Sequence, residues 1–74
     1  MQIETTKGHI TATEKTHIKA LFKANLIEGK VNRKTYFLDK ISNDNFKVQI
    51  FTPMKNDYGK KFNYKNTSYF TIKN

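Results

Sequence analysis

The chain has 74 residues, a formal net charge of +8 at pH 7 and no cysteine. A chain this short buries too little surface to build two cores, so we expect one small basic domain over residues 1–74. The lack of cysteine excludes disulfides, thiolate zinc sites and cysteine nucleophiles.

The apolar segments of the chain are short. None approaches the roughly 20 consecutive apolar residues that span a bilayer. The start, Met1-Gln2-Ile3-Glu4, lacks both the basic end and the apolar centre of a secretory signal. We therefore expect a cytoplasmic protein without a membrane partner.

The positive charge is concentrated in the last third of the chain. Residues 46–74 contain six lysines and one aspartate, whereas residues 1–29 carry a net charge of only +1. Such a field attracts polyanions and weakens with salt, which favours nucleic acid or an acidic protein surface as partner. Lysine outnumbers arginine 13 to 1, and arginine is the preferred group for bidentate base contacts, so we do not expect sequence-specific base reading.

The first third of the chain predicts a strand and then a helix. Residues 1–7 alternate weakly around Ile3, which is typical of a short edge strand. Thr11-Ala12-Thr13-Glu14 matches a capping box, and we expect a helix from about residue 12 to Glu28, ended by Gly29.

The predicted helix has one apolar stripe, which we expect to lie on a sheet. The stripe consists of Ile18, Leu21, Phe22 and Leu26. Lys15, Lys19 and Lys23 follow one another along its edge, and they form either a basic ridge or an ordinary solvated flank.

The remainder of the chain predicts three antiparallel strands. Lys34–Ile41, Phe46–Met54 and Phe62–Lys73 are rich in aromatic and β-branched residues, and two turn-like segments separate them. The fold class is therefore α+β, with a short N-terminal strand and one helix packed on a three-stranded β-meander.

Turn chemistry predicts the register of both hairpins. A two- or four-residue loop in the first hairpin places Ile41 opposite Phe46. In the second, a three-residue loop, Asp57–Gly59, places Phe46 opposite Phe70. Both registers give the same core face for the helix to cover: Phe37, Ile41, Phe46, Val48, Ile50 and Phe70.

The same registers define a second face that no predicted element covers. Its rows are Tyr36, Phe51 and Lys65, then Leu38, Gln49 and Thr67, then Lys40, Lys47 and Tyr69. Aromatic rings that stack on bases, beside lysines that neutralise phosphates, are typical of proteins that bind single strands. The alternative is that the N-terminal segment or a homodimer buries this face.

We predict a small non-enzymatic module that contacts nucleic acid or a nucleoprotein complex and acts by occupancy, without a cofactor. The predicted binding residues are Tyr36, Lys40, Lys47, Phe51, Lys60, Lys61, Lys65 and Tyr69. A second hypothesis, by analogy of size and composition alone, is an inhibitor of the anti-CRISPR or anti-nuclease type, encoded by a phage or mobile element and acting in the host cytoplasm. Such an inhibitor would bind a host defence protein complex.

An enzyme is the least favoured class. The candidate acids, bases and phosphate ligands are Glu14, His9, His17, Arg33 and Tyr64. Glu14 is explained by the capping box, and two histidines without cysteine or an acidic cluster do not form a convincing metal site.

Overall fold

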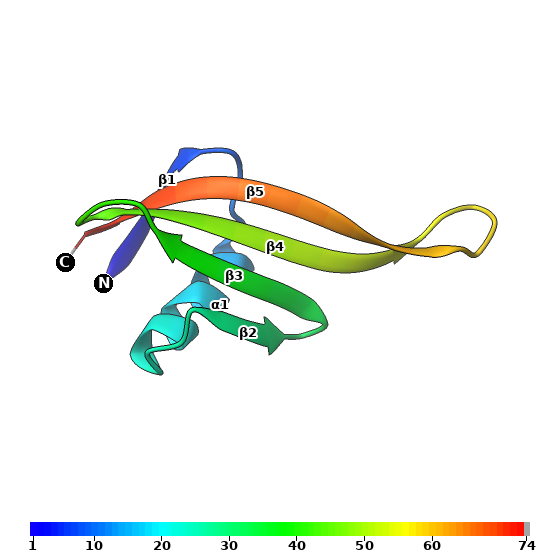
Figure 1. The fold of residues 1–74 in the computed structure, drawn as a ribbon, viewed down its shortest axis with the longest axis horizontal. Coiled ribbons are helices and arrows are strands. Elements are labelled where there is room, and N and C mark those ends of the chain that lie inside the picture. The colour runs from blue at the N-terminus through cyan, green and yellow to red at the C-terminus, as the bar shows by residue number, and fades with distance from the viewer. Residues whose placement is uncertain (74) are drawn as a thin grey trace.

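One α-helix and one five-stranded antiparallel sheet make up the computed structural model, which describes residues 1–73. The elements are β1 (Gln2–Lys7), α1 (Ala12–Lys23), β2 (Glu28–Val31), β3 (Lys34–Lys40), β4 (Asn45–Lys55) and β5 (Lys61–Lys73). The predicted α+β class is confirmed. The strand order is β1-β5-β4-β3-β2, which differs from the predicted three-stranded meander: β1 and β2 extend it at its two edges, and β2 was not predicted (Figure 1).

The N-terminal strand forms one edge of the sheet, as predicted. β1 pairs antiparallel with β5, and Ile3 lies opposite Ile72 and is buried in the core. The chain then turns at Gly8, whose φ of +82° favours glycine. An added Cβ there would lie 2.5 Å from the Ser68 side-chain oxygen, so the turn packs directly on β5.

The helix begins as predicted and ends earlier. The Glu14 N–H donates to the Thr11 hydroxyl at 3.1 Å and the Thr11 N–H donates to the Glu14 carboxylate at 2.9 Å, which completes the capping box. The helix stops at Lys23 because Asn25 takes the left-handed conformation with a φ of 56°, and the Leu26 N–H donates back to the Leu21 carbonyl. The predicted end at Gly29 is therefore wrong.

β2 was not predicted: it overlaps the predicted helix only at Glu28, and it begins where Gly29 was expected to end the helix. β2 and β3 are joined by Asn32 and Arg33, which both have positive φ, of 48° and 72°, as a two-residue hairpin turn requires. Gly29 lies within β2, where an added Cβ would come within 2.4 Å of a Leu21 methyl group. The glycine thus lets the helix approach this edge of the sheet.

The predicted register of the β3–β4 hairpin is wrong by one residue. Lys40, not Ile41, lies opposite Phe46, because the Ile41 N–H donates to the Asn45 carbonyl and closes a loop with an odd number of residues. A shift of one residue exchanges the two faces of a strand. Tyr36 and Leu38 consequently enter the core, whereas Phe37 and Ile41, which were predicted there, are 37% and 55% exposed.

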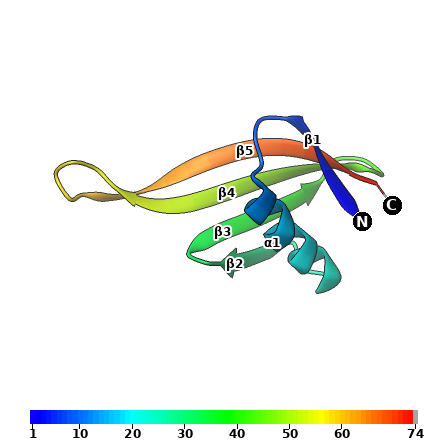
Figure 2. The ribbon, with the colours of Figure 1, turned by 180° about the vertical axis from the view of Figure 1, so that it is seen from behind.

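The predicted register of the β4–β5 hairpin is confirmed. Phe46 lies opposite Phe70, and the turn is closed by Gly59 with a φ of 76°. The β3 pairing reaches only to Phe51 and the β1 pairing only to Tyr69. Residues 53–63 therefore form a two-stranded extension, here called the arm, which projects beyond the other elements (Figures 1 and 2).

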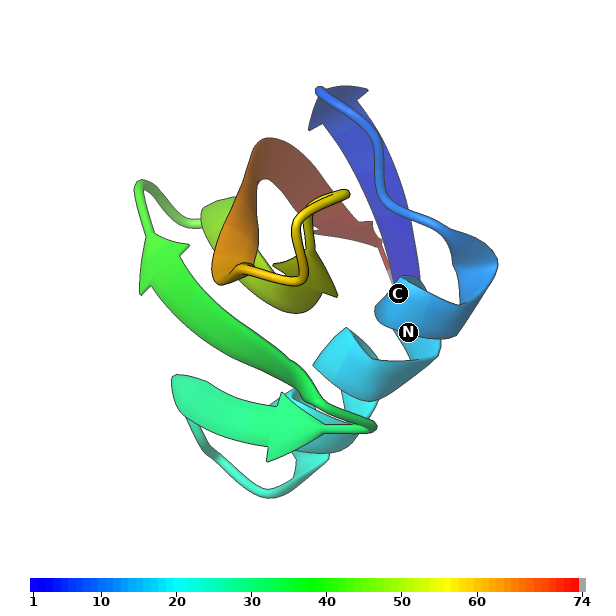
Figure 3. The same ribbon diagram turned by 90° about the vertical axis from the view of Figure 1, so that its right-hand side faces the viewer.

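The core lies between α1 and one face of the sheet. Seen along the long axis, α1 lies on one side of the curved sheet, between β1 and β2 (Figure 3). Phe22 of α1 contacts Phe46 and Phe70 edge-on, with ring centroids 5.1 and 6.1 Å away. The buried apolar residues are Ile3, Ile10, Ile18, Leu21, Tyr36, Leu38, Val48, Ile50 and Phe70. Within residues 1–73, no helix is long and apolar enough to cross a membrane.

Candidate nucleic-acid interface

The face of the sheet opposite α1, here called the outer face, displays aromatic rings and lysines side by side. Strand pairing gives its rows as Asp39, Lys47 and Tyr69, then Phe37, Gln49 and Thr67, then Thr35, Phe51 and Lys65. The β4 and β5 members of each row are those that the sequence predicted. Only the β3 members differ, each by one position, because of the register shift.

The aromatic rings of the outer face are held in place and partly open to solvent. Phe37 and Phe51 contact each other edge to face, with centroids 5.5 Å apart. The ring of Tyr69 lies 5.8 Å from the ammonium nitrogen of Lys7, close enough for a cation–π contact. Phe51 and Tyr69 are half-buried, so each ring is supported by the sheet and still presents part of its surface.

The lysines of the outer face belong to neither salt bridge of residues 1–73. The salt bridges in residues 1–73 join Lys34 to Glu14 and Lys73 to Glu4, so Lys47 and Lys65 take part in neither. Lys30, which pairs with Thr35, adds a further positive charge beside the third row. Lys30 was not among the predicted binding residues, because residues 29–33 were assigned to no strand.

Two predicted binding residues lie away from the outer face. Tyr36 is fully buried, and its hydroxyl is 2.7 Å from the His17 imidazole nitrogen. Burial, with a smaller effect of the Glu14 charge, raises the pKa of Tyr36 to about 12. Lys40 lines a hollow with Phe22 on the helix side of β3. The prediction that Tyr36 and Lys40 share a binding face with Tyr69 is therefore wrong, because β3 is shifted by one residue.

Lys60 and Lys61 belong to the arm. Lys60 lies next to the turn, where its N–H donates to the Asn56 side-chain oxygen at 2.9 Å. Lys61 begins β5 and lies opposite Lys55. Both side chains are exposed, so the arm carries positive charge beyond the end of β3.

Two of the side chains considered for catalysis, those of Glu14 and His17, are engaged in structural contacts. Burial alone raises the pKa of Glu14, but hydrogen bonds from Thr11 and Lys34 outweigh it and hold the pKa below its ordinary value. The His17 imidazole shares a hydrogen bond with the Tyr36 hydroxyl. Among residues 1–73, no group of three His, Cys, Asp or Glu side chains converges to hold a metal ion.

Comparison with protein-family models, with curated proteins and with solved structures found no significant match to the chain. The candidate interface therefore rests on the chemistry and geometry of its own residues.

Proposed function

We propose that the protein binds single-stranded nucleic acid on the outer face of its sheet and acts by occupying it, without catalysis. The observation that carries this proposal is the pattern on β4 and β5. Two partly exposed rings, Phe51 and Tyr69, alternate with Lys47 and Lys65 on a face that α1 leaves uncovered, and these two lysines belong to neither salt bridge of residues 1–73.

Each component of this pattern has a defined role in the proposed complex. Bases stack on Phe51 and Tyr69, which contributes about 1–3 kcal/mol per base and tolerates any sequence. Lys47 and Lys65 neutralise backbone phosphates. The logarithm of the binding constant falls linearly with the logarithm of the salt concentration, and each phosphate neutralised on a single strand adds roughly 0.7 to the steepness of this line, here called the salt slope. With one arginine in the chain, this recognition is independent of base sequence.

A pair of tyrosine variants tests the proposal. Tyr69 and Tyr64 lie on the same strand, on opposite faces, and neither is buried. We expect Tyr69→Ala to weaken binding of a labelled single-stranded oligonucleotide, measured by fluorescence anisotropy, whereas Tyr64→Ala leaves it unchanged. A thermal melt of each variant verifies folding. Equal binding by the two folded variants would contradict the proposal.

The arm favours a second candidate function, that of an inhibitor that binds an acidic protein surface. On the side that corresponds to the helix face, the arm exposes two apolar side chains, Met54 and Phe62, and Tyr64 is exposed directly next to them on β5. Exposed apolar groups next to lysines are common where proteins dock. A partner retained in a pull-down by the wild type and lost with Phe62→Ser, together with weak binding of free DNA and RNA, would favour this function instead.

A further inference from the structure

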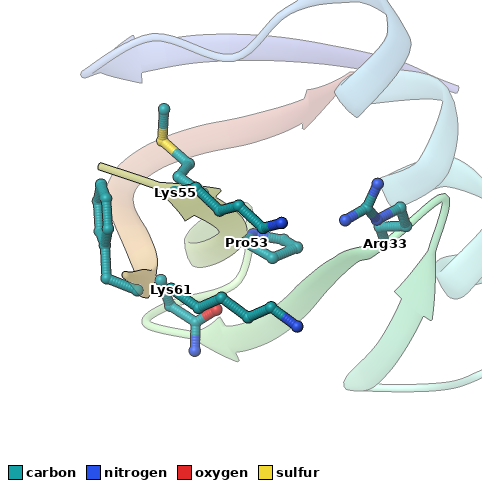
Figure 4. A pocket seen from close by; sticks show the side chains of 7 residues that line it. Arg33, Pro53, Lys55 and Lys61 are labelled. Carbon is teal, nitrogen blue, oxygen red and sulfur yellow. The ribbon is translucent and has the colours of Figure 1, made fainter. Parts of the chain in front are cut away.

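A second cluster of cations surrounds an open hollow where the arm leaves the sheet. The hollow has a volume of about 590 Å³, and its lining includes Arg33 from the β2–β3 turn, Pro53 and Lys55 from β4, and Lys61 from β5. Figure 4 shows the charged ends of Arg33, Lys55 and Lys61 directed into the same space beside the ring of Pro53.

The sequence brings these three positive charges together by two separate turns. Lys55 and Lys61 are the last residue pair of the arm, directly opposite each other across the two strands. Arg33 is presented by the tight β2–β3 turn, in which its φ is 72°. Like charges placed opposite each other in a sheet are destabilising, so this arrangement costs stability in the free protein.

The charges around the hollow are not neutralised within the described residues. In residues 1–73, neither salt bridge includes Arg33, Lys55 or Lys61, and no carboxylate lines the hollow. A bound anion with several charges would relieve the repulsion between the three side chains. Arginine provides a planar fork for two phosphate oxygens, and the lysines provide point charges on either side.

The hollow continues the outer face along the same two strands. The row of Phe51 and Lys65 is followed on that face by Pro53 and Asn63, and then by Lys55 and Lys61. Arg33 immediately precedes β3, whose residue Thr35 lies opposite Phe51, and so it extends the sheet toward Pro53. A single-stranded nucleic acid that lies on the outer face and follows β4 and β5 would therefore reach the hollow.

We propose that Arg33, Lys55 and Lys61 bind phosphate groups of the nucleic-acid backbone, and that the hollow extends the interface from the outer face onto the arm. This inference rests on the proposed function. Contacts to phosphates position a strand and do not read its bases. The outer face supplies stacking surface, and the hollow fixes the path of the backbone.

The single arginine of the chain provides a direct probe of the hollow. Arg33 is the only arginine, so its side-chain N–H group gives one signal of its kind in an NMR spectrum of the ¹⁵N-labelled protein. On titration with tripolyphosphate, we expect saturable shifts of this signal and of the Lys55 and Lys61 amides. Shifts of equal size at Lys19 and Lys23 on α1 would overturn the inference, because they would indicate general attraction to the basic surface.

Two triple variants that remove the same charge extend the test to nucleic acid. Arg33→Gln/Lys55→Gln/Lys61→Gln alters the hollow, and Lys15→Gln/Lys19→Gln/Lys23→Gln alters a helix flank of equal charge. We expect the hollow variant to bind single-stranded DNA more weakly and to lower the salt slope by about 2, because each lost phosphate contact removes roughly 0.7. The helix variant should change the slope less.

The two proposals fail in different ways. Equal losses in the two triple variants would overturn the role of the hollow, and the comparison of Tyr69→Ala with Tyr64→Ala would still decide whether the outer face binds bases. Loss of binding in the hollow variant, with equal binding by the two tyrosine variants, would retain the hollow as the phosphate site and reject stacking on the outer face.

Discussion

The two faces of the sheet contain similar side chains and use them differently. On the helix face, Ile50 and Phe70 are fully buried beneath α1. On the outer face, Phe51 and Tyr69 occupy the neighbouring positions of the same strands, but lysines stand beside them and no helix covers them. Residues next to each other in the sequence thus serve either the core or the surface, and strand register decides which.

The largest difference that we expect between the faces is in stability. Phe70→Ala should lower the free energy of unfolding by about 3–5 kcal/mol, the usual cost of deleting a buried phenylalanine side chain. Phe70 stacks on Phe46, with ring centroids 5.4 Å apart, and contacts Phe22 edge-on. Tyr69→Ala should cost much less because Tyr69 is only half-buried. Urea unfolding measures both changes, and equal losses would contradict the assignment of the two faces.

The next effect concerns charge and binding. Lys47→Glu/Lys65→Glu should weaken single-stranded DNA binding by at least about tenfold, equivalent to 1.4 kcal/mol. The salt slope should fall by about 1.4, because two phosphate contacts are lost. Lys19→Glu/Lys23→Glu on α1 is the matched control. If the helix variant loses as much affinity in a salt-dependent anisotropy titration, the outer face has no special role.

A smaller effect is expected from the buried hydroxyl of the helix face. Tyr36→Phe removes the hydrogen bond to His17 and should lower the free energy of unfolding by about 1 kcal/mol at neutral pH. Nucleic-acid binding should be unchanged, since Tyr36 is buried away from the outer face. Reduced binding by the folded variant would show that Tyr36 reaches the ligand.

The same residue predicts a loss of stability in alkali. Burial raises the pKa of Tyr36 from 10.0 to about 12, so the folded state holds the phenolic proton more tightly than the unfolded state does. This contribution is complete below pH 10 and is lost as the pH rises toward 12. Melting temperatures measured over this range should fall more for the wild type than for Tyr36→Phe, and parallel curves would contradict the assignment.

The smallest effect is expected at the exposed ion pair between β1 and β5. Lys73 and Glu4 are 2.8 Å apart, and the hydrogen bond and charge of Lys73 hold the pKa of Glu4 below its ordinary value. Both side chains are more than half exposed, with relative accessibilities of 62% and 58%, and solvent screens such pairs. Glu4→Gln should leave the urea midpoint unchanged, and a clear decrease would indicate that this pair anchors β1.

The parts of the fold that could be predicted are those with restrictive local chemistry. The capping box at Thr11 and Glu14 fixes the start of α1, and Gly59 at the end of a three-residue loop fixes the β4–β5 register. The β4–β5 register places Lys47 and Tyr69 opposite each other on one face. Four of the predicted site residues therefore lie together where the sequence places them: Lys47, Phe51, Lys65 and Tyr69.

The errors arose where the sequence is compatible with more than one local backbone conformation. Residues 42–45 contain no glycine, and whether their loop is even or odd depends on the Asn45 hydrogen bonds and on the burial of Tyr36. At the end of α1, Asn25 adopts the left-handed conformation that glycine usually provides. Because no glycine marks this position, the end of α1 and the start of β2 could not be located from the sequence. The incorrect positions of Tyr36 and Lys40 follow from the first of these errors.

The measurement that tests the central claim most directly is photochemical crosslinking of the protein to an iodouracil-substituted single strand, with the crosslinked residues identified by mass spectrometry. Stacking of bases on the outer face predicts crosslinks at Phe51 or Tyr69. Tyr58, at the tip of the arm and 95% exposed, serves as a control for accessibility alone. Crosslinks at Tyr58 and Tyr64 without any at Phe51 or Tyr69 would contradict the account.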